Sequence, residues 1–189
     1  MIALLIIVLF LQSNKVVSSM VPTPKSYVIL SNLQSGSNIG SICRNALSFG
    51  VSEVLVVGRK NYKGKMRQAD RGAKEILKFR SFPSTAEAAN YLKSPEVDAE
   101  IVGLEIMEGS EPLSTLTYKT GQNVAFIFGN EGKGLSENQR SVCDRFCYIP
   151  QFSSGMASIN VSCCSAIVLH HFAINAGFTE ASIVGEKFG

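Results

Sequence analysis

The sequence predicts one α/β domain, in which helices cover both faces of a parallel sheet. Short apolar segments that end at glycine or proline alternate with segments of helical period along most of the chain. The first two strand segments enclose one helix within about thirty residues, the length of a β–α–β unit, which requires parallel strands. The chain has 189 residues, 46% of them hydrophobic, which suits a single domain with a sizeable core.

The first 20 residues are set apart from this domain, which we expect to span residues 21–189. Residues 2–11 are all apolar but too few to cross a bilayer, so we expect no stable membrane span. Residues 17–19 resemble a signal-peptidase site, yet no Lys or Arg precedes the apolar run. Three interpretations stay open: a targeting signal, a membrane-surface anchor, or upstream sequence outside the working protein, with Met20 as an alternative start.

The charges of the chain are unevenly distributed. Between Arg59 and Arg80 there are nine basic residues and two acidic ones, whereas the rest of the chain holds nine basic and thirteen acidic residues. A local basic segment in an otherwise acidic protein suggests a polyanionic partner, and a solvated loop is the alternative.

The five cysteines indicate the compartment. Their number is odd and three of them lie in apolar helical patterns, which favours reduced thiols and therefore an intracellular location, in the cytoplasm or an organelle. Neither these cysteines nor His170 and His171 have the spacing of a metal site, so we expect no metal.

The strands and helices can be assigned in order from their hydrophobic period. The expected strands are short apolar runs at residues 27–30, 53–57, 99–106, 123–128 and 145–149. The expected helices cover residues 39–49, 84–93 and about 158–176, with a short polar helix before the last strand. Asn38 is the expected cap of the first helix, and Ser84 with Glu87 forms a capping box at the second.

Two longer segments have no clear period. Residues 59–80 are expected to be mostly loop, and residues 108–121 a loop with one helical turn.

Two loops follow strands late in the chain and predict one cleft. Residues 129–136 are rich in glycine, and residues 151–157 are mostly small. Ligands of parallel sheets bind outside the carboxyl ends of the strands, where these loops lie. The first loop is no phosphate loop, because Leu135 stands where Lys is required, and it lacks the glycine fingerprint of dinucleotide-binding proteins. An NAD-dependent dehydrogenase is therefore disfavoured.

Five polar residues, two in the first expected helix and three in or just after these loops, have plain structural interpretations when each is taken alone. Asn38, Ser158 and Asn160 can be helix caps. Arg44 can be a surface cation, and Glu131 a solvated acid in a turn. As a site, Asn38 is expected to lean toward the mouth of the cleft, where Arg44 can reach it.

Three stretches together resemble the SpoU (TrmH-type) branch of the SPOUT RNA 2′-O-ribose methyltransferases. They are residues 37–50, 127–135 and 149–162. The three occur in the order and spacing of that family and span residues 27 to about 176. One departure is Ile159, where the family more often has Leu.

The resemblance implies a fold, a cofactor and an oligomeric state. The fold is a parallel sheet with helices on both faces and a C-terminal trefoil knot, and the protein is a homodimer. The cofactor is S-adenosylmethionine, bound bent in the knot loops. The residues that match its contacts are Leu104, Gly129, Ile149, Ser158 and Ile159.

The resemblance also implies the catalytic residues, with Arg44 at the centre and Asn38, Glu131, Ser158 and Asn160 completing the site. A sulfonium methyl group is already activated, so the protein mainly aligns it with a ribose hydroxyl. Arg44 is a poor base while protonated. Two routes for the proton are open: a bound RNA phosphate that Arg44 orients, which we favour, or Arg44 itself after unusual deprotonation.

The resemblance leaves the RNA undecided. Without the extra RNA-binding domain of some relatives, the chain is expected to contact RNA through its core, a second subunit and the basic residues Lys63, Lys65, Arg67 and Arg71. So small a chain favours tRNA over rRNA. The alternative from another class is a catalytically silent RNA-binding protein of the same fold, and the complete set of catalytic residues argues against it.

Overall fold

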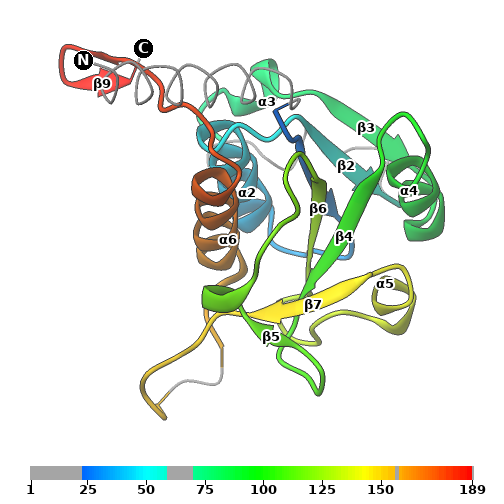
Figure 1. The fold of residues 1–189 in the computed structure, drawn as a ribbon. Helices are drawn as coiled ribbons and strands as arrows, with labels where there is room; N and C mark the ends of the chain where they lie inside the picture. The colour runs from blue at the N-terminus through cyan, green and yellow to red at the C-terminus, as the bar shows by residue number, and fades with distance from the viewer. Residues whose placement is uncertain (1–22, 59–69, 156–157, 189) are drawn as a thin grey trace, which may run out of the picture.

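The computed structural model describes residues 23–58, 70–155 and 158–188, and helix and strand labels are those of Figure 1. The expected N-terminal extension, residues 1–20, lies outside the described residues, as do Lys63, Lys65 and Arg67. Within the described ranges, no helix combines the length and apolar composition needed to cross a bilayer.

Seven parallel strands form one sheet in the order β3-β2-β1-β6-β4-β7-β5, which confirms the predicted parallel α/β class. The strands are β1 Ser26–Leu30, β2 Glu53–Val57, β3 Phe79–Phe82, β4 Ala99–Leu104, β5 Glu111–Pro112, β6 Asn123–Phe128 and β7 Arg145–Tyr148. The helices are α2 Gly36–Ser48, α3 Ala73–Ile76, α4 Thr85–Leu92, α5 Glu137–Arg140 and α6 Val161–Asn175, with a 3-10 turn at Leu113–Thr115.

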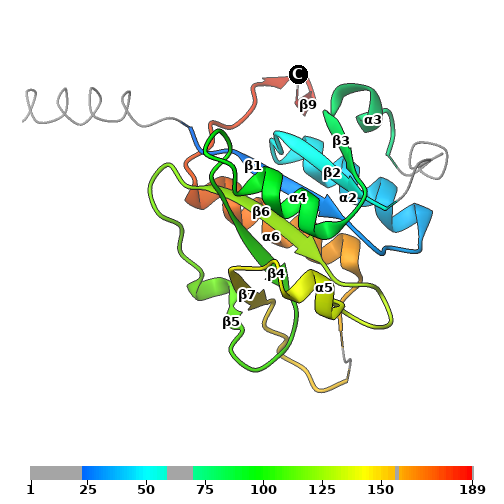
Figure 2. The same cartoon turned by 90° about the vertical axis from the view of Figure 1, so that its right-hand side faces the viewer.

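Helices cover both faces of the sheet (Figures 1 and 2). Helices α2 and α6 lie side by side on one face, while α4 and α5 lie on the other. In β1, Val28 and Leu30 pack on the α2–α6 side, and the intervening Ile29 packs on the α4 side. Successive strand residues point to opposite faces, so a strand buried on both sides is apolar at most of its positions.

Helix α2 begins earlier than expected, and the prediction that Asn38 caps it is wrong. Ser35 is the N-cap, with an extended backbone and a side chain that accepts from Asn38 N at 3.3 Å. Asn38 therefore lies in the first turn, where its side chain is free to turn toward the cleft. At its other end α2 is followed by Gly50, whose φ of +70° stops the helix.

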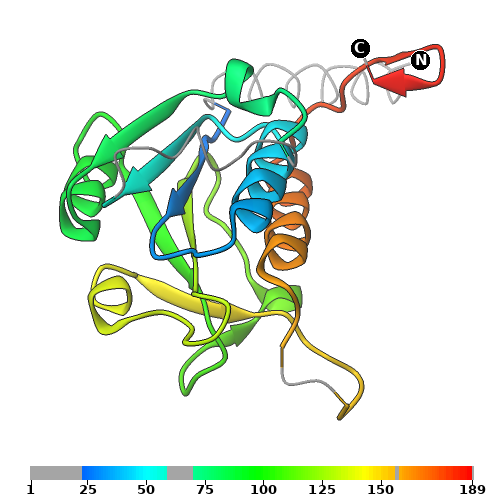
Figure 3. The ribbon, with the colours of Figure 1, turned by 180° about the vertical axis from the view of Figure 1, so that it is seen from behind.

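Helix α6 begins later than expected. Asn160 is its N-cap and accepts from Ser162 N at 2.8 Å, so Ser158 lies before the helix. Figure 3 shows α2 and α6 as neighbours from behind. Asn45 on α2 joins them, since its Nδ2 donates to Ser162 O at 2.8 Å and to Ser165 Oγ at 2.9 Å.

Five short elements differ from the prediction: α3, β3, β5, β8 and β9. The end of the basic segment, predicted to be mostly loop, forms α3 and the edge strand β3. In the expected loop 108–121, β5 precedes the predicted helical turn. After α6, the strands Ile183–Val184 and Lys187–Phe188 form an antiparallel pair, β8 and β9. The trefoil knot stays a prediction, since strand order and register do not define how the chain threads.

Candidate active site

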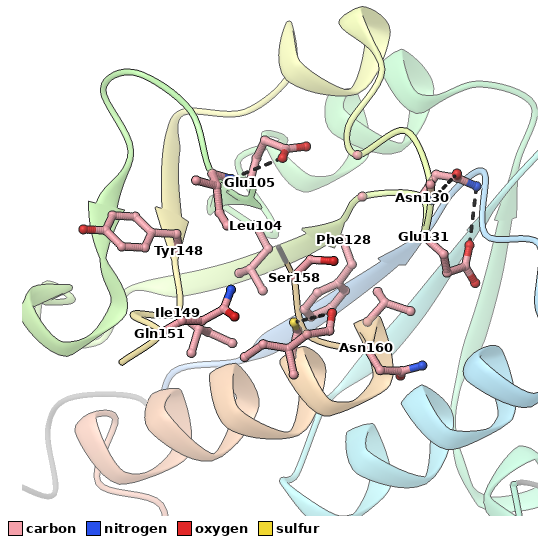
Figure 4. Close-up of a pocket in the computed structure, with 17 residues that line it drawn as sticks. Leu104, Glu105, Phe128, Asn130, Glu131, Tyr148, Ile149, Gln151, Ser158 and Asn160 are labelled. Carbon is pink, nitrogen blue, oxygen red and sulfur yellow. Dashed lines mark hydrogen bonds between the residues drawn. The ribbon is translucent and has the colours of Figure 1, made fainter. Parts of the chain in front are cut away.

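A pocket of about 410 Å³ opens at the carboxyl ends of the strands (Figure 4). Its walls come from four segments: residues 104–106 after β4, 128–134 after β6, 148–151 after β7, and 158–164 at the start of α6. The expected cleft between the loops after β6 and β7 is therefore present. Its size is in the range of small-molecule sites.

All five residues predicted to contact the cofactor line this one pocket: Leu104, Gly129, Ile149, Ser158 and Ile159. Leu104, Ile149 and Ile159 are half-buried and give the pocket an apolar part. The structure thus brings together residues that are up to 55 positions apart in the sequence, and their role in cofactor binding stays a prediction.

Asn130 shapes the glycine-rich loop after β6. Its backbone exchanges two hydrogen bonds of 2.9 Å with Gly134, and its Oδ1 accepts from Gly132 N at 3.0 Å and Lys133 N at 3.2 Å. At Gly129 an added Cβ would come within 2.7 Å of the Gly134 backbone. The loop folds back so closely that only glycine fits at position 129.

Three predicted catalytic residues form a chain of hydrogen bonds at one end of the pocket. Asn38 Nδ2 donates to Glu131 Oε1 at 2.9 Å, and Asn160 Nδ2 donates to Asn38 Oδ1 at 3.2 Å. Both ends of the Asn38 amide are engaged, so its orientation is fixed. Ser158 lines the same pocket from the segment before α6.

Glu131 is held by several donors. Besides Asn38, its carboxylate accepts from Ser35 N at 3.3 Å and Gln34 N at 3.4 Å, at the N-terminus of α2. Burial raises the pKa of this carboxyl, but the hydrogen bonds from Asn38 and the backbone N–H groups outweigh it, and the pKa lies below its usual value of 4.5. Glu131 is therefore an ionised acceptor that orients its neighbours.

Arg44 is not brought into the pocket. Its side chain is exposed, does not line the pocket, and forms no hydrogen bond or ion pair with any residue in the described part of the chain. Helical geometry separates the two side chains: Arg44 follows Asn38 by six residues, so it lies about 9 Å further along α2 and about 240° around the helix axis. The expected approach of Asn38 and Arg44 is thus wrong for the single chain, although Asn38 does lean toward the cleft.

Sequence reasoning missed Asn45, Asn130 and Glu105. Asn45 joins the two helices that present Asn38 and Asn160, and only its place next to Arg44 within a motif could have indicated this. Glu105 directly follows β4 at the edge of the sheet where ligands bind, a position that could have marked it.

The charge of the pocket is negative. The charged side chains among its described lining residues are Glu105 and Glu131. Across the described residues, no three His, Cys, Asp or Glu side chains gather as a metal site would require.

Solved structures of other proteins share this fold. An AdoMet-bound rRNA methyltransferase from Sinorhizobium meliloti superposes with a TM-score of 0.71 at 22% identity, over 84% of this chain and 59% of its own. The SpoU methyltransferase AviRb from Streptomyces viridochromogenes gives 0.72 at 24% identity, over 84% of this chain and 63% of its own. The fold is that of the SPOUT methyltransferases.

The family follows from the sequence profile of the SpoU rRNA Methylase family, which matches residues 25–170. The chain belongs to this family. It is 27% identical over 148 residues to rRNA methyltransferase 1, mitochondrial, of Dictyostelium discoideum. It is 26% identical over 149 residues to the 23S rRNA (guanosine-2′-O-)-methyltransferase RlmB of Bordetella pertussis. These matches cover 76% and 78% of this chain but only 28% and 58% of the two relatives.

Proposed function

We propose that this protein is an S-adenosylmethionine-dependent methyltransferase that modifies a ribose 2′-hydroxyl of RNA. The observation that carries the proposal is the chain of hydrogen bonds Asn160–Asn38–Glu131 at the wall of a pocket between the loops after β6 and β7. The family match and the names of the relatives, which include a guanosine-2′-O-methyltransferase, support the chemistry.

The pocket suits S-adenosylmethionine. Leu104, Ile149 and Ile159 offer apolar surface to a flat base. Gly129 lines the pocket and, as a glycine, presents only backbone atoms to a ligand. Two lining carboxylates, with no cation among the described lining residues, match a positively charged cofactor. When bound, this cofactor supplies an activated methyl group.

The protein's own residues would mainly position the substrate. Glu131 has a lowered pKa and several hydrogen-bond donors, so it is a weak base and a good anchor for Asn38. This supports our preference for an RNA phosphate as the acceptor of the ribose proton. Arg44 is exposed and lies outside the pocket. From there it would contact the bound RNA and hold that phosphate with its planar guanidinium group.

A homodimer is part of this proposal. Helix α6 contains no Asp, Glu, Lys or Arg, and it has exposed residues at helical spacing along one stripe: Cys163, Ile167, His170 and Ile174. Ile167 and Ile174 are 42% and 64% exposed, which is unfavourable for a helix that faces water alone. Burying this stripe against a second copy would remove the exposed apolar surface.

The RNA and the compartment are also proposals. Arg71 is exposed at the end of the basic segment, where it can contact a phosphate backbone. The relatives are named for rRNA or for tRNA/rRNA, and our preference for tRNA over rRNA stays a prediction that the product analysis decides. An intracellular site, cytoplasm or organelle, is supported by the odd number of cysteines, five, and by relatives that are mitochondrial or bacterial.

The test combines binding and product analysis. Calorimetry should show binding of S-adenosylhomocysteine and none of NAD. The protein is then incubated with S-adenosylmethionine and either tRNA or rRNA from cells that lack it, and the digested RNA is analysed by mass spectrometry. A 2′-O-methylated nucleoside is expected, and the RNA that carries it identifies the substrate. Cofactor and RNA binding without any methylated nucleoside would favour the silent RNA-binding protein.

A further inference from the structure

We propose that Glu105 recognises the ribose of the cofactor, its carboxylate accepting hydrogen bonds from the two vicinal hydroxyls. The inference rests on the proposed function, because it assigns a role within the same pocket. Glu105 belongs to none of the three stretches that carry the resemblance, and it follows β4 directly.

The Glu105 carboxylate is held in place at the pocket wall. Its backbone N donates to Cys147 O of β7 at 3.0 Å. Its Oε2 accepts from Leu135 N at 2.6 Å, and its Oε1 accepts from Ile106 N at 3.2 Å. The side chain therefore links the loops after β4 and β6, and these hydrogen bonds fix the position of its carboxylate.

Gly134 leaves room for this arrangement. A Cβ at Gly134 would overlap Glu105 Oε2, and the φ of this glycine is +65°. A side chain at position 134 would displace the carboxylate. The loop is thus built around Glu105 as well as around the backbone contact at Gly129.

Glu105 has unused acceptor capacity, in contrast to Glu131. An ionised carboxylate has about four acceptor sites, and the two backbone N–H groups occupy two of those on Glu105. Glu131 accepts from four donors and is saturated. In the described part of the chain Glu105 forms no ion pair, so no cation competes for its free sites.

The position of Glu105 favours a sugar over the methionine tail. Figure 4 shows Glu105 beside Leu104, across the pocket from Asn160. The apolar residues next to Glu105 suit the base, whereas the Asn160–Asn38–Glu131 chain marks the reacting end. A ribose joins these two parts of the cofactor. In dinucleotide-binding proteins an Asp or Glu accepts a hydrogen bond from a ribose hydroxyl, and a carboxylate with two free acceptor sites can accept from two hydroxyls on adjacent carbons.

Calorimetry with Glu105→Gln tests the inference. Gln keeps an oxygen for Leu135 N but loses the charge and part of the acceptor capacity. We expect affinity for S-adenosylhomocysteine, S-adenosylmethionine and adenosine to fall by a similar factor, about 10- to 100-fold, because each carries the same diol. Glu108→Gln is the matched control, because Glu108 is exposed, follows Glu105 by three residues and does not line the pocket. The Glu108→Gln variant should bind all three ligands with wild-type affinity.

A second readout changes the ligand. The wild-type protein should bind 2′-deoxyadenosine and 3′-deoxyadenosine more weakly than adenosine, and Glu105→Gln should remove most of that difference. Loss of binding for S-adenosylmethionine alone, or equal binding of adenosine and its deoxy forms, would overturn the assignment to ribose. If the wild-type protein binds S-adenosylhomocysteine and Glu105→Gln binds it equally well, this inference alone is overturned. If the wild-type protein does not bind S-adenosylhomocysteine at all, the proposed function is overturned too.

Discussion

Two glycines of one loop, Gly129 and Gly132, have very different surroundings. A Cβ at Gly129 would lie 2.7–2.8 Å from backbone atoms of Gly134 and Leu135, whereas one at Gly132 would meet nothing closer than 3.8 Å. Gly129→Ala should therefore lower the free energy of unfolding by about 1–3 kcal/mol, because backbone cannot move aside cheaply. Gly132→Ala is the control and should change it by less than about 0.5 kcal/mol. Urea unfolding without ligand measures both, and equal effects would contradict the close approach at Gly129.

Glu131 should make stability depend on pH in acid. Its folded pKa is below 4.5, so the stabilisation is present above pH 4.5 and is lost as the pH falls through the folded pKa. At pH 7, Glu131→Gln should lower the free energy of unfolding by less than about 1 kcal/mol, because the carboxylate is exposed. At the lowest pH where the protein still folds, variant and wild type should converge. A constant difference across this range would mean that the ionised form is not the one stabilised.

Arg44→Lys separates a catalytic role from a surface cation. The substitution keeps the charge but loses the planar donor fork, so the single-turnover rate of methyl transfer should fall by about 100-fold or more if Arg44 holds a phosphate. Affinity for S-adenosylhomocysteine should stay within about threefold of wild type, because Arg44 does not line the pocket. Arg140→Lys, an exposed arginine on α5, is the control. A near-wild-type rate would remove Arg44 from the mechanism.

At the residue scale, motifs identified most of the site but not its internal geometry. Asn38, Glu131 and Asn160 were expected together, and they bond to one another. The contact of the Glu131 carboxylate with the backbone just before α2 could not be predicted, because its hydrogen bond from Gln34 N joins residues 97 positions apart. Glu105 was not predicted at all, since its position in the pocket depends on the contact with Leu135 N in the loop after β6, 30 residues away in the sequence.

Among the elements, α2 and α6 hold the two ends of the catalytic chain, and Asn45 links them. Asn45→Ala removes hydrogen bonds to Ser162 O and Ser165 Oγ, and Ser165 is fully buried. We expect a loss of about 1–2 kcal/mol in the free energy of unfolding. Methyl transfer should also slow, because the Asn160–Asn38 contact depends on this packing.

The control for Asn45→Ala is Asn90→Ala. Asn90 is exposed on α4, and its side chain forms no hydrogen bond with another described residue. It should cost less than about 0.5 kcal/mol, because alanine is the better helix former. Similar losses in both variants would show that the α2–α6 link is not what Asn45 contributes.

Strands in the middle of the sheet were easier to predict than those at its edges. β2 and β6 have the predicted bounds because the residues after Glu53 and after Asn123 form continuous apolar runs, buried on both faces. The edge strand β3 contains exposed Arg80 and Ser81, and β5 has two residues, so neither has a recognisable pattern. The start of α2 was misplaced because Ser35, Ser37 and Asn38 are all acceptable caps.

At the scale of the whole molecule, the proposed dimer can be tested through α6. Ile167→Lys places a charge in the exposed apolar stripe and should convert a dimer into a monomer. Ala86→Lys, on α4 at the opposite face of the sheet, should leave the dimer intact. Light scattering after size-exclusion chromatography gives the mass of each. A wild-type monomer, or a dimer that survives Ile167→Lys, would contradict the proposed interface.

The place of β1 in the sheet has a consequence for how the chain folds. One neighbour, β2, follows closely in sequence, but the other is β6, and the hydrogen bond from Lys25 N to Asn123 Oδ1 joins residues 98 positions apart. Pairing across so long a loop slows folding, since the closure entropy is lost before the contacts form. During synthesis, β1 therefore leaves the ribosome long before its second partner exists. Until β6 emerges, an apolar strand with an open edge is exposed to other nascent chains, so the early half of this protein is the part that most needs a chaperone.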